Sequence, residues 1–128
     1  MRALLDTHAF LWWAMDEARL SAMARRILGD SSNTLLLSVA SAWEIVIKVQ
    51  AGRLKLPLRP GHYITERTSY YAIESLPIVL SHALQVEALP NLHRDPFDRM
   101  LVAQSRVERL PILTADPQIR AYKVETIW

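Results

Sequence analysis

Five acidic residues stand in positions that an ordinary surface charge does not explain. Two follow short apolar segments, one interrupts an apolar run and two open a later one: Asp6, Asp116, Glu44, Asp95 and Asp98. Carboxylates that converge repel each other strongly unless a cation lies between them. Mg²⁺ and Mn²⁺ are hard ions that prefer carboxylates and water as ligands. Such an ion activates water and stabilises charge on a leaving oxygen, so the set predicts hydrolysis of a phosphodiester.

Two of these acids come directly after predicted strands. Asp6 follows Ala3-Leu4-Leu5, and Asp116 lies shortly after Leu113. Functional sites of parallel α/β sheets gather at the carboxyl ends of the strands, which is where both acids fall. The alternative for each is a helix N-cap, a position that Asp also favours. Both interpretations remain open on the sequence.

Glu44 lies in the middle of an apolar helical pattern that runs from Val39 to Ile47. An ionised carboxylate in such a run is costly unless it is paired or binds a metal. Lys48 stands at i+4 in the favourable order and offers an intrahelical ion pair. That pair is worth roughly a few tenths of a kcal/mol on a surface, so it explains Lys48 better than it explains Glu44.

Asp95 and Asp98 open the helix predicted over 95–109, in which Pro96 takes the first position. Residues three apart face the same side of a helix, and the dipole and free N–H groups of its first turn favour negative charge. Capping alone accounts for one of the two acids. The other is then a candidate ligand.

The elements that must position these acids alternate between strands and helices. Short apolar segments predict strands at 2–5, 34–38, 73–76, 112–114 and 124–127. Caps and apolar spacing predict helices at 22–29 after Ser21, 39–51 before Gly52, 61–72 after Pro60, 81–88 and 95–109. Alternation of this kind implies crossover connections and a mostly parallel sheet, which predicts an α/β fold.

Composition sets the remaining bounds. A chain of 128 residues that is 51% hydrophobic fits a single domain over 1–128. It has no cysteine, which excludes disulfides and thiolate metal sites. Arginine supplies twelve of the fifteen cations but the net charge is only +2, which permits a nucleic-acid partner without requiring one. The apolar stretches near the N-terminus are too short and interrupted for a membrane span, so we expect a soluble cytoplasmic protein.

Four blocks together resemble the PIN-domain toxins of the VapC type. They are LLDTH at 4–8, SVASAWEIVIKVQAGRLKLP at 38–57, RDPFDRMLVAQS at 94–105 and ILTAD at 112–116. The family pattern is a strand-end Asp, a helical Glu, an Asp that opens a later helix and a last Asp after the T-x-D strand. The resemblance carries these positions onto Asp6, Glu44, Asp98 and Asp116. Asp98 is preferred to Asp95 because an apolar run with a small residue follows it, which leaves Asp95 as a cap or an auxiliary acid.

The resemblance implies a three-layer α/β/α sandwich and an endoribonuclease that depends on Mg²⁺, with Mn²⁺ as a substitute. It also implies that Asp6, Glu44 and Asp98 ligate or orient the metal and its water, with Asp116 completing the shell directly or through water. RNA as substrate, a homodimer and inhibition by a VapB-type antitoxin are further implications. DNA is an alternative substrate on the residue chemistry alone.

Several other residues near the acidic blocks have two interpretations. His8 and His93 are candidate donors to phosphate or proton shuttles, although metal and water need no imidazole base. Thr114 hydrogen-bonds a carboxylate or phosphate, or is simply structural. Arg94 and Arg99 either receive an RNA backbone or neutralise nearby acids. Trp12, Trp13 and Trp43 are stacking platforms or core, and for Trp43 we predict core.

Two other functions compete with the nuclease. A phosphatase would use Asp6 as a covalent nucleophile, but the usual second acid two residues on is replaced by His8. A PIN fold that only binds and no longer catalyses is the other alternative, and the presence of all four expected acids argues against it.

Overall fold

The computed structural model describes residues 1–128 and contains one five-stranded parallel sheet. The strand order is β3-β2-β1-β4-β5, and every neighbouring pair is parallel. The strands are β1 (Arg2–Leu5), β2 (Thr34–Ser38), β3 (Glu74–Leu76), β4 (Ile112–Leu113) and β5 (Thr126–Ile127). All five predicted strands are present, and the last three are shorter than expected.

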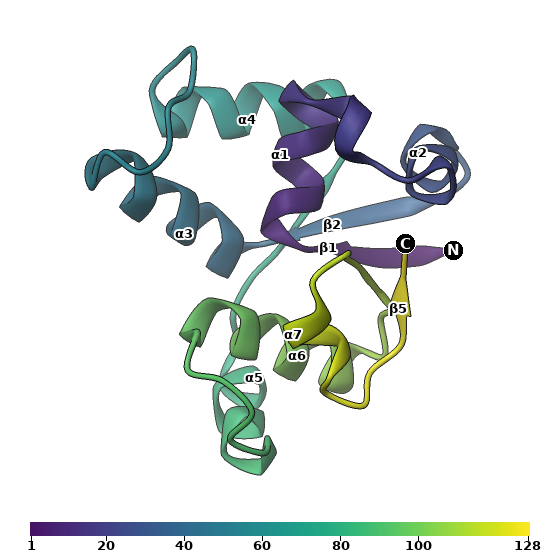
Figure 1. The fold of residues 1–128 in the computed structure, drawn as a ribbon, viewed down its shortest axis with the longest axis vertical. Coiled ribbons are helices and arrows are strands. Elements are labelled where there is room, and N and C mark those ends of the chain that lie inside the picture. The colour runs from purple at the N-terminus through teal and green to yellow at the C-terminus, as the bar shows by residue number, and fades with distance from the viewer.

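Helices cover both faces of this sheet (Figure 1). They are α1 (Thr7–Met15), η1 (Glu17–Arg19), α2 (Ala22–Gly29), α3 (Val39–Gln50), α4 (Pro60–Tyr70), α5 (Leu80–Gln85), η2 (Val86–Ala88), α6 (Pro96–Glu108) and α7 (Pro117–Arg120). The first four α-helices lie above the sheet in Figure 1 and the last three lie below it. The predicted three-layer α/β/α architecture is confirmed.

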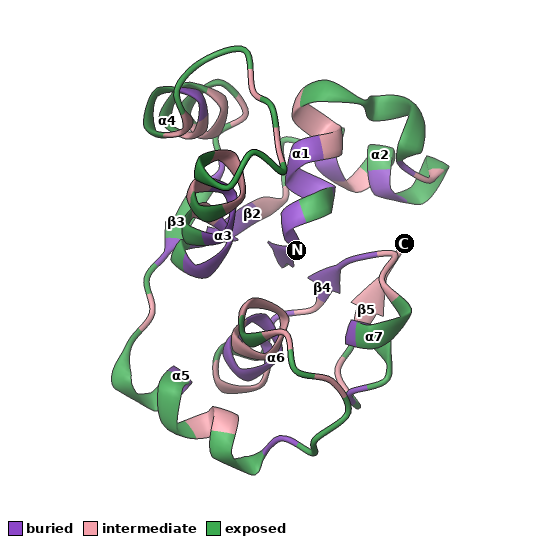
Figure 2. Ribbon diagram, turned by 60° about the vertical axis from the view of Figure 1, so that its left-hand side comes forward, coloured by how far each residue is buried: buried purple, intermediate pink, exposed green.

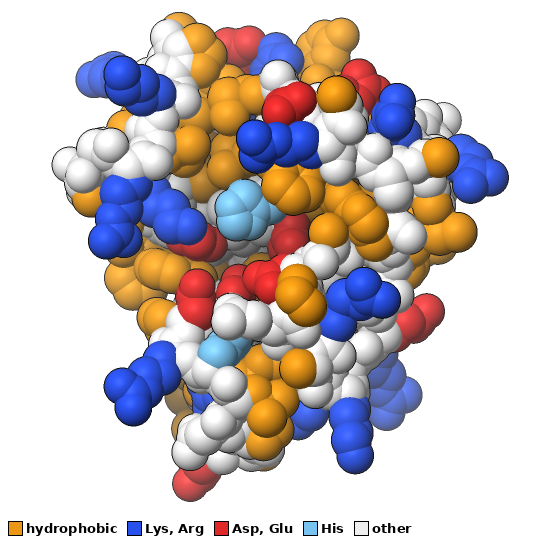
Figure 3. Space-filling model, in the orientation of Figure 1, with side chains coloured by type: hydrophobic (Ala, Val, Ile, Leu, Met, Phe, Trp, Pro, Cys, Tyr) orange, Lys and Arg blue, Asp and Glu red, His pale blue; other side chains and the backbone are white.

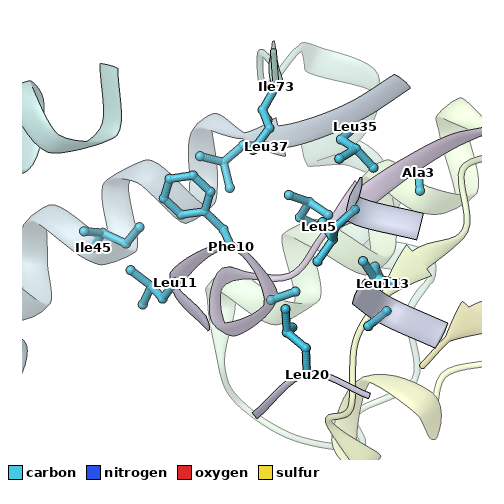
Figure 4. Packing of buried hydrophobic residues seen from close by; sticks show 13 residues of the cluster. Ala3, Leu5, Phe10, Leu11, Leu20, Leu35, Leu37, Ile45, Ile73 and Leu113 are labelled. Carbon is cyan, nitrogen blue, oxygen red and sulfur yellow. The ribbon is translucent and has the colours of Figure 1, made fainter. Parts of the chain in front are cut away.

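The strands build two cores because successive side chains point to opposite faces. Leu5, Leu35 and Leu37 join α1 and α2 on one face, with Phe10 at the centre of the packing (Figure 4). Leu4 and Leu36 join α6 and α7 on the other face. The buried sides of the helices face the sheet on both sides of the molecule (Figure 2). The runs of leucine follow from this double coverage.

Local chain signals placed most helix ends correctly. Ser21 caps α2 by accepting from Ala24 N, and Asp95 caps α6 ahead of Pro96. Gly52 adopts φ +74° just after α3 ends, a left-handed conformation that glycine enters without a steric penalty. These caps fix where each helix starts relative to the strand before it.

Two helices and one side chain were not predicted correctly. Helix α1 lacks the 3.6-residue pattern that marks an amphipathic helix because its outward side is also apolar: Trp12 is half-buried and Met15 is 45% exposed. Helix α7 is a single turn after Asp116. The core prediction for Trp43 is wrong: its side chain is 58% exposed and packs edge-to-face on Phe97.

None of the helices combines the length and apolar character needed to cross a bilayer.

The two cores predict a clear stability test. Leu4 and Leu5 are 0% exposed on opposite faces of β1. Replacing either by Ala removes buried methyl groups and leaves a cavity, so Leu4→Ala and Leu5→Ala should each lower the free energy of unfolding by about 2–5 kcal/mol in urea titrations. Leu58→Ala, at a site that is 42% exposed, is the matched control and should change it by less than about 0.5 kcal/mol. Equal effects at all three sites would contradict the two-core arrangement.

Candidate active site

Acidic side chains gather around a hollow in the middle of one face of the molecule (Figure 3). The hollow lies between α1 and α3 on one side and α6 and α7 on the other (Figures 1 and 3). The acids close enough to Asp98 to act on its charge are Asp95, Asp116, Glu44 and Asp6, in that order of strength. All five acids singled out in the sequence therefore meet at the carboxyl edge of the sheet.

Asp6 is buried at the junction between β1 and α1, with 4% of its surface exposed. Its Oδ1 accepts a 2.6 Å hydrogen bond from Ala9 N, which caps α1. Its Oδ2 accepts a short hydrogen bond from the Thr114 hydroxyl. Burial raises the pKa of Asp6 even though both bonds act to lower it. Asp6 is thus a helix cap and a member of the acidic cluster at once.

Thr114 connects the ends of β1 and β4. Its hydroxyl donates to Asp6 and accepts a 3.0 Å hydrogen bond from Asp116 N. Asp116 in turn caps α7 by accepting from Gln118 N at 2.8 Å. Of the two interpretations of Thr114, hydrogen bonding to a carboxylate is the one that the geometry bears out. Asp6, Asp116 and the exposed His8 line a shallow pocket of about 260 Å³.

Glu44 reaches the same hollow from α3 and is buried, with 3% of its surface exposed. Its Oε1 accepts from the Thr7 hydroxyl at 2.7 Å, and its Oε2 lies 2.5 Å from Lys48 Nζ. The intrahelical pair with Lys48 therefore exists. It does not displace Glu44 to the surface, because the Thr7 hydroxyl holds the carboxylate on the buried side of the helix.

Asp95 and Asp98 occupy the first turn of α6. Asp95 Oδ1 accepts from the backbone N–H groups of Phe97 and Asp98, so Asp95 takes the cap. The Asp98 carboxylate accepts no hydrogen bond, and His93 Nε2 lies 3.6 Å from its Oδ2. Of the pair, Asp98 is the carboxylate left free for a ligand.

Burial and the charges of the other four acids both act on Asp98. Burial raises its pKa to about 7, and the charges of Asp95, Asp116, Glu44 and Asp6 act in the same direction. Like charges in a half-buried hollow disfavour further ionisation, because water there screens them poorly. Perturbation of this size by several carboxylates is typical of a functional site.

The carboxylates surround the hollow without closing on a common point. No group of three His, Asp or Glu side chains is drawn together tightly enough to hold a metal ion. Each acid except Asp98 is held by protein hydrogen bonds. The donor chemistry, carboxylate oxygens at a site where negative charge accumulates, suits a hard divalent ion. The assignment of Asp6, Glu44, Asp98 and Asp116 as metal ligands remains a prediction.

The basic and aromatic residues weighed in the sequence separate into different environments. Arg99 is not free for RNA, because Nη1 donates to Pro90 O and to the Tyr122 hydroxyl. Arg94 is exposed and forms no ion pair within 4.0 Å. His93 is mostly buried beside Asp98. Trp12 is half-buried between His8 and Trp128, so it lies at the rim of the acidic pocket.

Sequence reasoning missed two residues that support the acids. Thr7 was visible only as the neighbour of Asp6, and its bond to Glu44 spans 37 positions in the chain. Tyr122 lies 29 positions after His93 and hydrogen-bonds its ring. No local sequence pattern predicts contacts between residues so far apart in the chain, because only the folded sheet brings these residues together.

Comparison with known proteins agrees with this architecture. The PIN domain family model matches residues 3–125. Ribonuclease VapC22 of Mycobacterium tuberculosis is 24% identical over 129 residues, which cover 98% of this chain and 97% of that protein. Ribonuclease VapC16 of the same organism is 36% identical over 58 residues, 45% of this chain and 41% of that protein.

A solved structure shares the fold. The crystal structure of VapBC2 from Rickettsia felis, bound to a DNA fragment from its promoter, superposes with a TM-score of 0.74 at 12% identity. The match covers 99% of this chain and 98% of that one. The family match extends over nearly the whole chain, from β1 to the segment before β5, and includes every acid of the cluster. The chain belongs to the PIN domain family.

Proposed function

We propose that this protein is a metal-dependent endoribonuclease that acts as the toxin of a VapBC-type toxin–antitoxin pair. The observation that carries the proposal is the gathering of Asp6, Glu44, Asp98 and Asp116 around one hollow, where burial and then the charges of the neighbouring acids raise the pKa of Asp98 to about 7. A cluster that resists its own ionisation favours a cation. The names of the VapC ribonucleases to which the chain is similar support RNA as the substrate.

The chain's own residues have distinct tasks in this proposal. Asp6, Glu44 and Asp98 would hold the divalent ion, Mg²⁺ or Mn²⁺, or orient its water, and Asp116 would complete its surroundings directly or through water. When bound, the ion supplies Lewis acidity at a phosphodiester and activates water for hydrolysis. The Thr114 hydroxyl donates a hydrogen bond to the Asp6 carboxylate and so orients it. Preorganised donors of this kind remove the need to reorganise the site during reaction.

Cations beside the acidic hollow favour a polyanionic substrate. A groove of about 380 Å³ shares His8 and Trp12 with the acidic pocket and is also lined by Arg19, Lys48 and Arg53. Lys48 is paired with Glu44 and Arg19 with Asp16, whereas Arg53 makes no ion pair within 4.0 Å. Phosphates of a bound strand gain most from the unpaired cation. We therefore place the RNA backbone along this groove.

The partners follow from the relatives. The VapBC2 structure is named as a complex with promoter DNA, which supports a VapB-type antitoxin for this chain. Such a pair acts where cellular RNA is made and used, so we assign the protein to the cytoplasm. The antitoxin would keep the nuclease inactive until it is removed.

A homodimer is supported by apolar side chains on the surface. On α3, Val39, Trp43 and Ile47 lie one turn apart and are 42%, 58% and 38% exposed. Leu80 and Leu84 on α5 are 73% and 61% exposed. Both helices lie toward the left in Figures 1 and 2. Grouped apolar exposure of this kind marks interaction surfaces, and we infer that a second copy covers it.

Metal and both central acids should be essential for RNA cleavage. Purified protein free of antitoxin is incubated with structured cellular RNA, with Mg²⁺, with Mn²⁺ or with EDTA. Asp6→Asn and Asp98→Asn should lower cleavage by at least about a hundredfold, because each removes charge from the metal site, and EDTA should abolish it. Asp30→Asn changes an exposed turn acid that bonds only Ser32 and is the matched control.

Parallel incubations with single-stranded DNA and small phosphate esters separate the competing functions. Phosphate release from esters without RNA cleavage would replace the nuclease by a phosphatase. Cleavage that EDTA and both Asn variants leave intact would contradict the metal mechanism. A folded protein that is silent on every substrate and binds RNA unchanged would be a binding module.

Proton and metal should compete for Asp98. Its folded-state pKa of about 7 lies above the model value of 3.8, so folding favours the protonated form. The stability this contributes is fully present below pH 4 and is lost as pH rises through 7, and Asp6, whose pKa is also raised, acts in the same direction. In EDTA the free energy of unfolding should fall by about 1 kcal/mol between pH 6 and pH 8.

The Asp98→Asn variant isolates that effect. Without a titrating carboxyl at this position, most of the loss between pH 6 and pH 8 should disappear, and the variant should be more stable than the native protein at pH 8 in EDTA. Mg²⁺ should stabilise the native protein at pH 8 and leave the variant nearly unchanged. Urea titrations measure the free energy of unfolding under each of these conditions, and a native protein that gains stability from pH 6 to pH 8 would overturn this account.

The dimer surface is tested by charge. Trp43→Lys places a cation in the middle of the α3 stripe and should convert a dimer to a monomer in sedimentation equilibrium, because an unpaired charge is costly in an apolar interface. Met23→Lys, at an exposed apolar position on α2, is the control and should leave the mass unchanged. A native protein that is monomeric at every concentration would refute the proposed dimer.

A further inference from the structure

A hydrogen-bonded chain of three partly or fully buried side chains leads to the acidic hollow. It consists of Arg99 of α6, Tyr122 and His93. The Tyr122 side chain is 0% exposed, and its hydroxyl lies 3.0 Å from Arg99 Nη1 and 3.0 Å from His93 Nδ1. The rings of His93 and Tyr122 pack edge-to-face with centroids 5.3 Å apart. None of the proposed catalytic tasks has used these three residues.

The directions of the hydrogen bonds determine the histidine tautomer. A guanidinium only donates, so Arg99 Nη1 donates to the Tyr122 oxygen. The Tyr122 proton then needs an acceptor, because a buried hydroxyl is rarely left unsatisfied. His93 Nδ1 is the acceptor that the structure provides. A neutral His93 whose Nδ1 accepts must carry its proton on Nε2.

The Nε2 atom of His93 points at the acidic cluster. It is buried and has no hydrogen-bond partner, and the closest carboxylate oxygen is Asp98 Oδ2 at 3.6 Å. That distance is too long for a hydrogen bond, so the Nε2–H donor has no acceptor although a carboxylate oxygen lies close to it. A buried donor without a partner is unfavourable, and a small movement of Asp98 toward His93 would give it an acceptor.

We propose that His93 is a positioning residue for Asp98. Its Nε2–H, held in that tautomer by Tyr122 and Arg99, donates to one oxygen of the Asp98 carboxylate and leaves the other oxygen to face the divalent ion. The proton on Nε2 excludes this nitrogen as a ligand. Carboxylate ligands in metal sites are themselves hydrogen-bonded, and losing such a partner weakens metal affinity by about 10–100-fold. This inference rests on the metal site of the proposed function.

Variants of two residues separate a positioning role from a merely structural one. Tyr122→Phe deletes one buried hydroxyl and keeps the ring. His93→Gln keeps an amide where Nε2 stands, whereas His93→Asn keeps one only on the Nδ1 side. Tyr63→Phe is the matched control, because Tyr63 is a second buried tyrosine whose hydroxyl has no partner. Thermal unfolding first establishes that each variant folds.

The readout is Mn²⁺ affinity by calorimetry, which does not depend on RNA cleavage. We expect Tyr122→Phe and His93→Asn to weaken Mn²⁺ binding by about tenfold or more, and His93→Gln to stay within about threefold of the native protein. Tyr63→Phe should leave the affinity unchanged. Nitrogen-15 NMR of the metal-free native protein should show the proton of neutral His93 on Nε2, and Tyr122→Phe should weaken that preference.

Each contrary result has one meaning. Native-like Mn²⁺ affinity in both Tyr122→Phe and His93→Asn overturns the positioning role, as does a native His93 with its proton on Nδ1. Should Tyr122→Phe fail to fold, equal affinities of His93→Asn and His93→Gln overturn it alone. A native protein that binds no Mn²⁺ overturns the proposed metal site as well. Binding that Asp98→Asn abolishes and both positioning variants leave intact overturns this inference and retains the proposed function.

Discussion

A carboxylate buried at the point where β1 becomes α1 is the constraint on which the site depends. Asp6 is nearly inaccessible to water, and such burial is tolerated only when hydrogen bonds replace solvation. Ala9 N supplies one bond from the first turn of α1, and the Thr114 hydroxyl supplies the other from the end of β4. The Ala9 donor is local to the start of α1, whereas the Thr114 donor is in place only if β1 and β4 pair in the observed parallel register. The site therefore forms only when the sheet has formed.

The same topology explains why helix caps and candidate ligands coincide. In a parallel sheet the carboxyl ends of the strands and the N-termini of the following helices share one edge. Free N–H groups at that edge attract carboxylates, and Asp6, Asp95 and Asp116 all cap helices there. On the sequence, capping and ligand binding were alternative interpretations of these acids. In the structure the two are compatible, because the capping hydrogen bonds fix the orientation of each carboxylate at the edge of the hollow.

The sequence predicted the strands, most helix ends and the convergence of the acids, because these follow from apolar runs, local caps and strand ends. It did not predict α1, whose outward side carries the apolar side chains of Trp12 and Met15 and therefore shows no amphipathic pattern. It also assigned Trp43 to the core, because an apolar run does not reveal that one stripe of α3 faces outward. Thr7 and Tyr122 form hydrogen bonds with residues 37 and 29 positions away in the sequence, and no local sequence pattern predicts such contacts.

The acids of the cluster differ in how firmly the protein holds them. Backbone N–H groups or hydroxyls bind Asp6, Asp95 and Asp116, and Glu44 has Thr7 and Lys48. Asp98 accepts no hydrogen bond. Burial raises its pKa and the charges of all four neighbours act in the same direction, so their repulsion falls on the one carboxylate that no hydrogen bond holds. A cation in the hollow would relieve this repulsion most at Asp98. The residues around Asp98 therefore have to fix the orientation of its carboxylate.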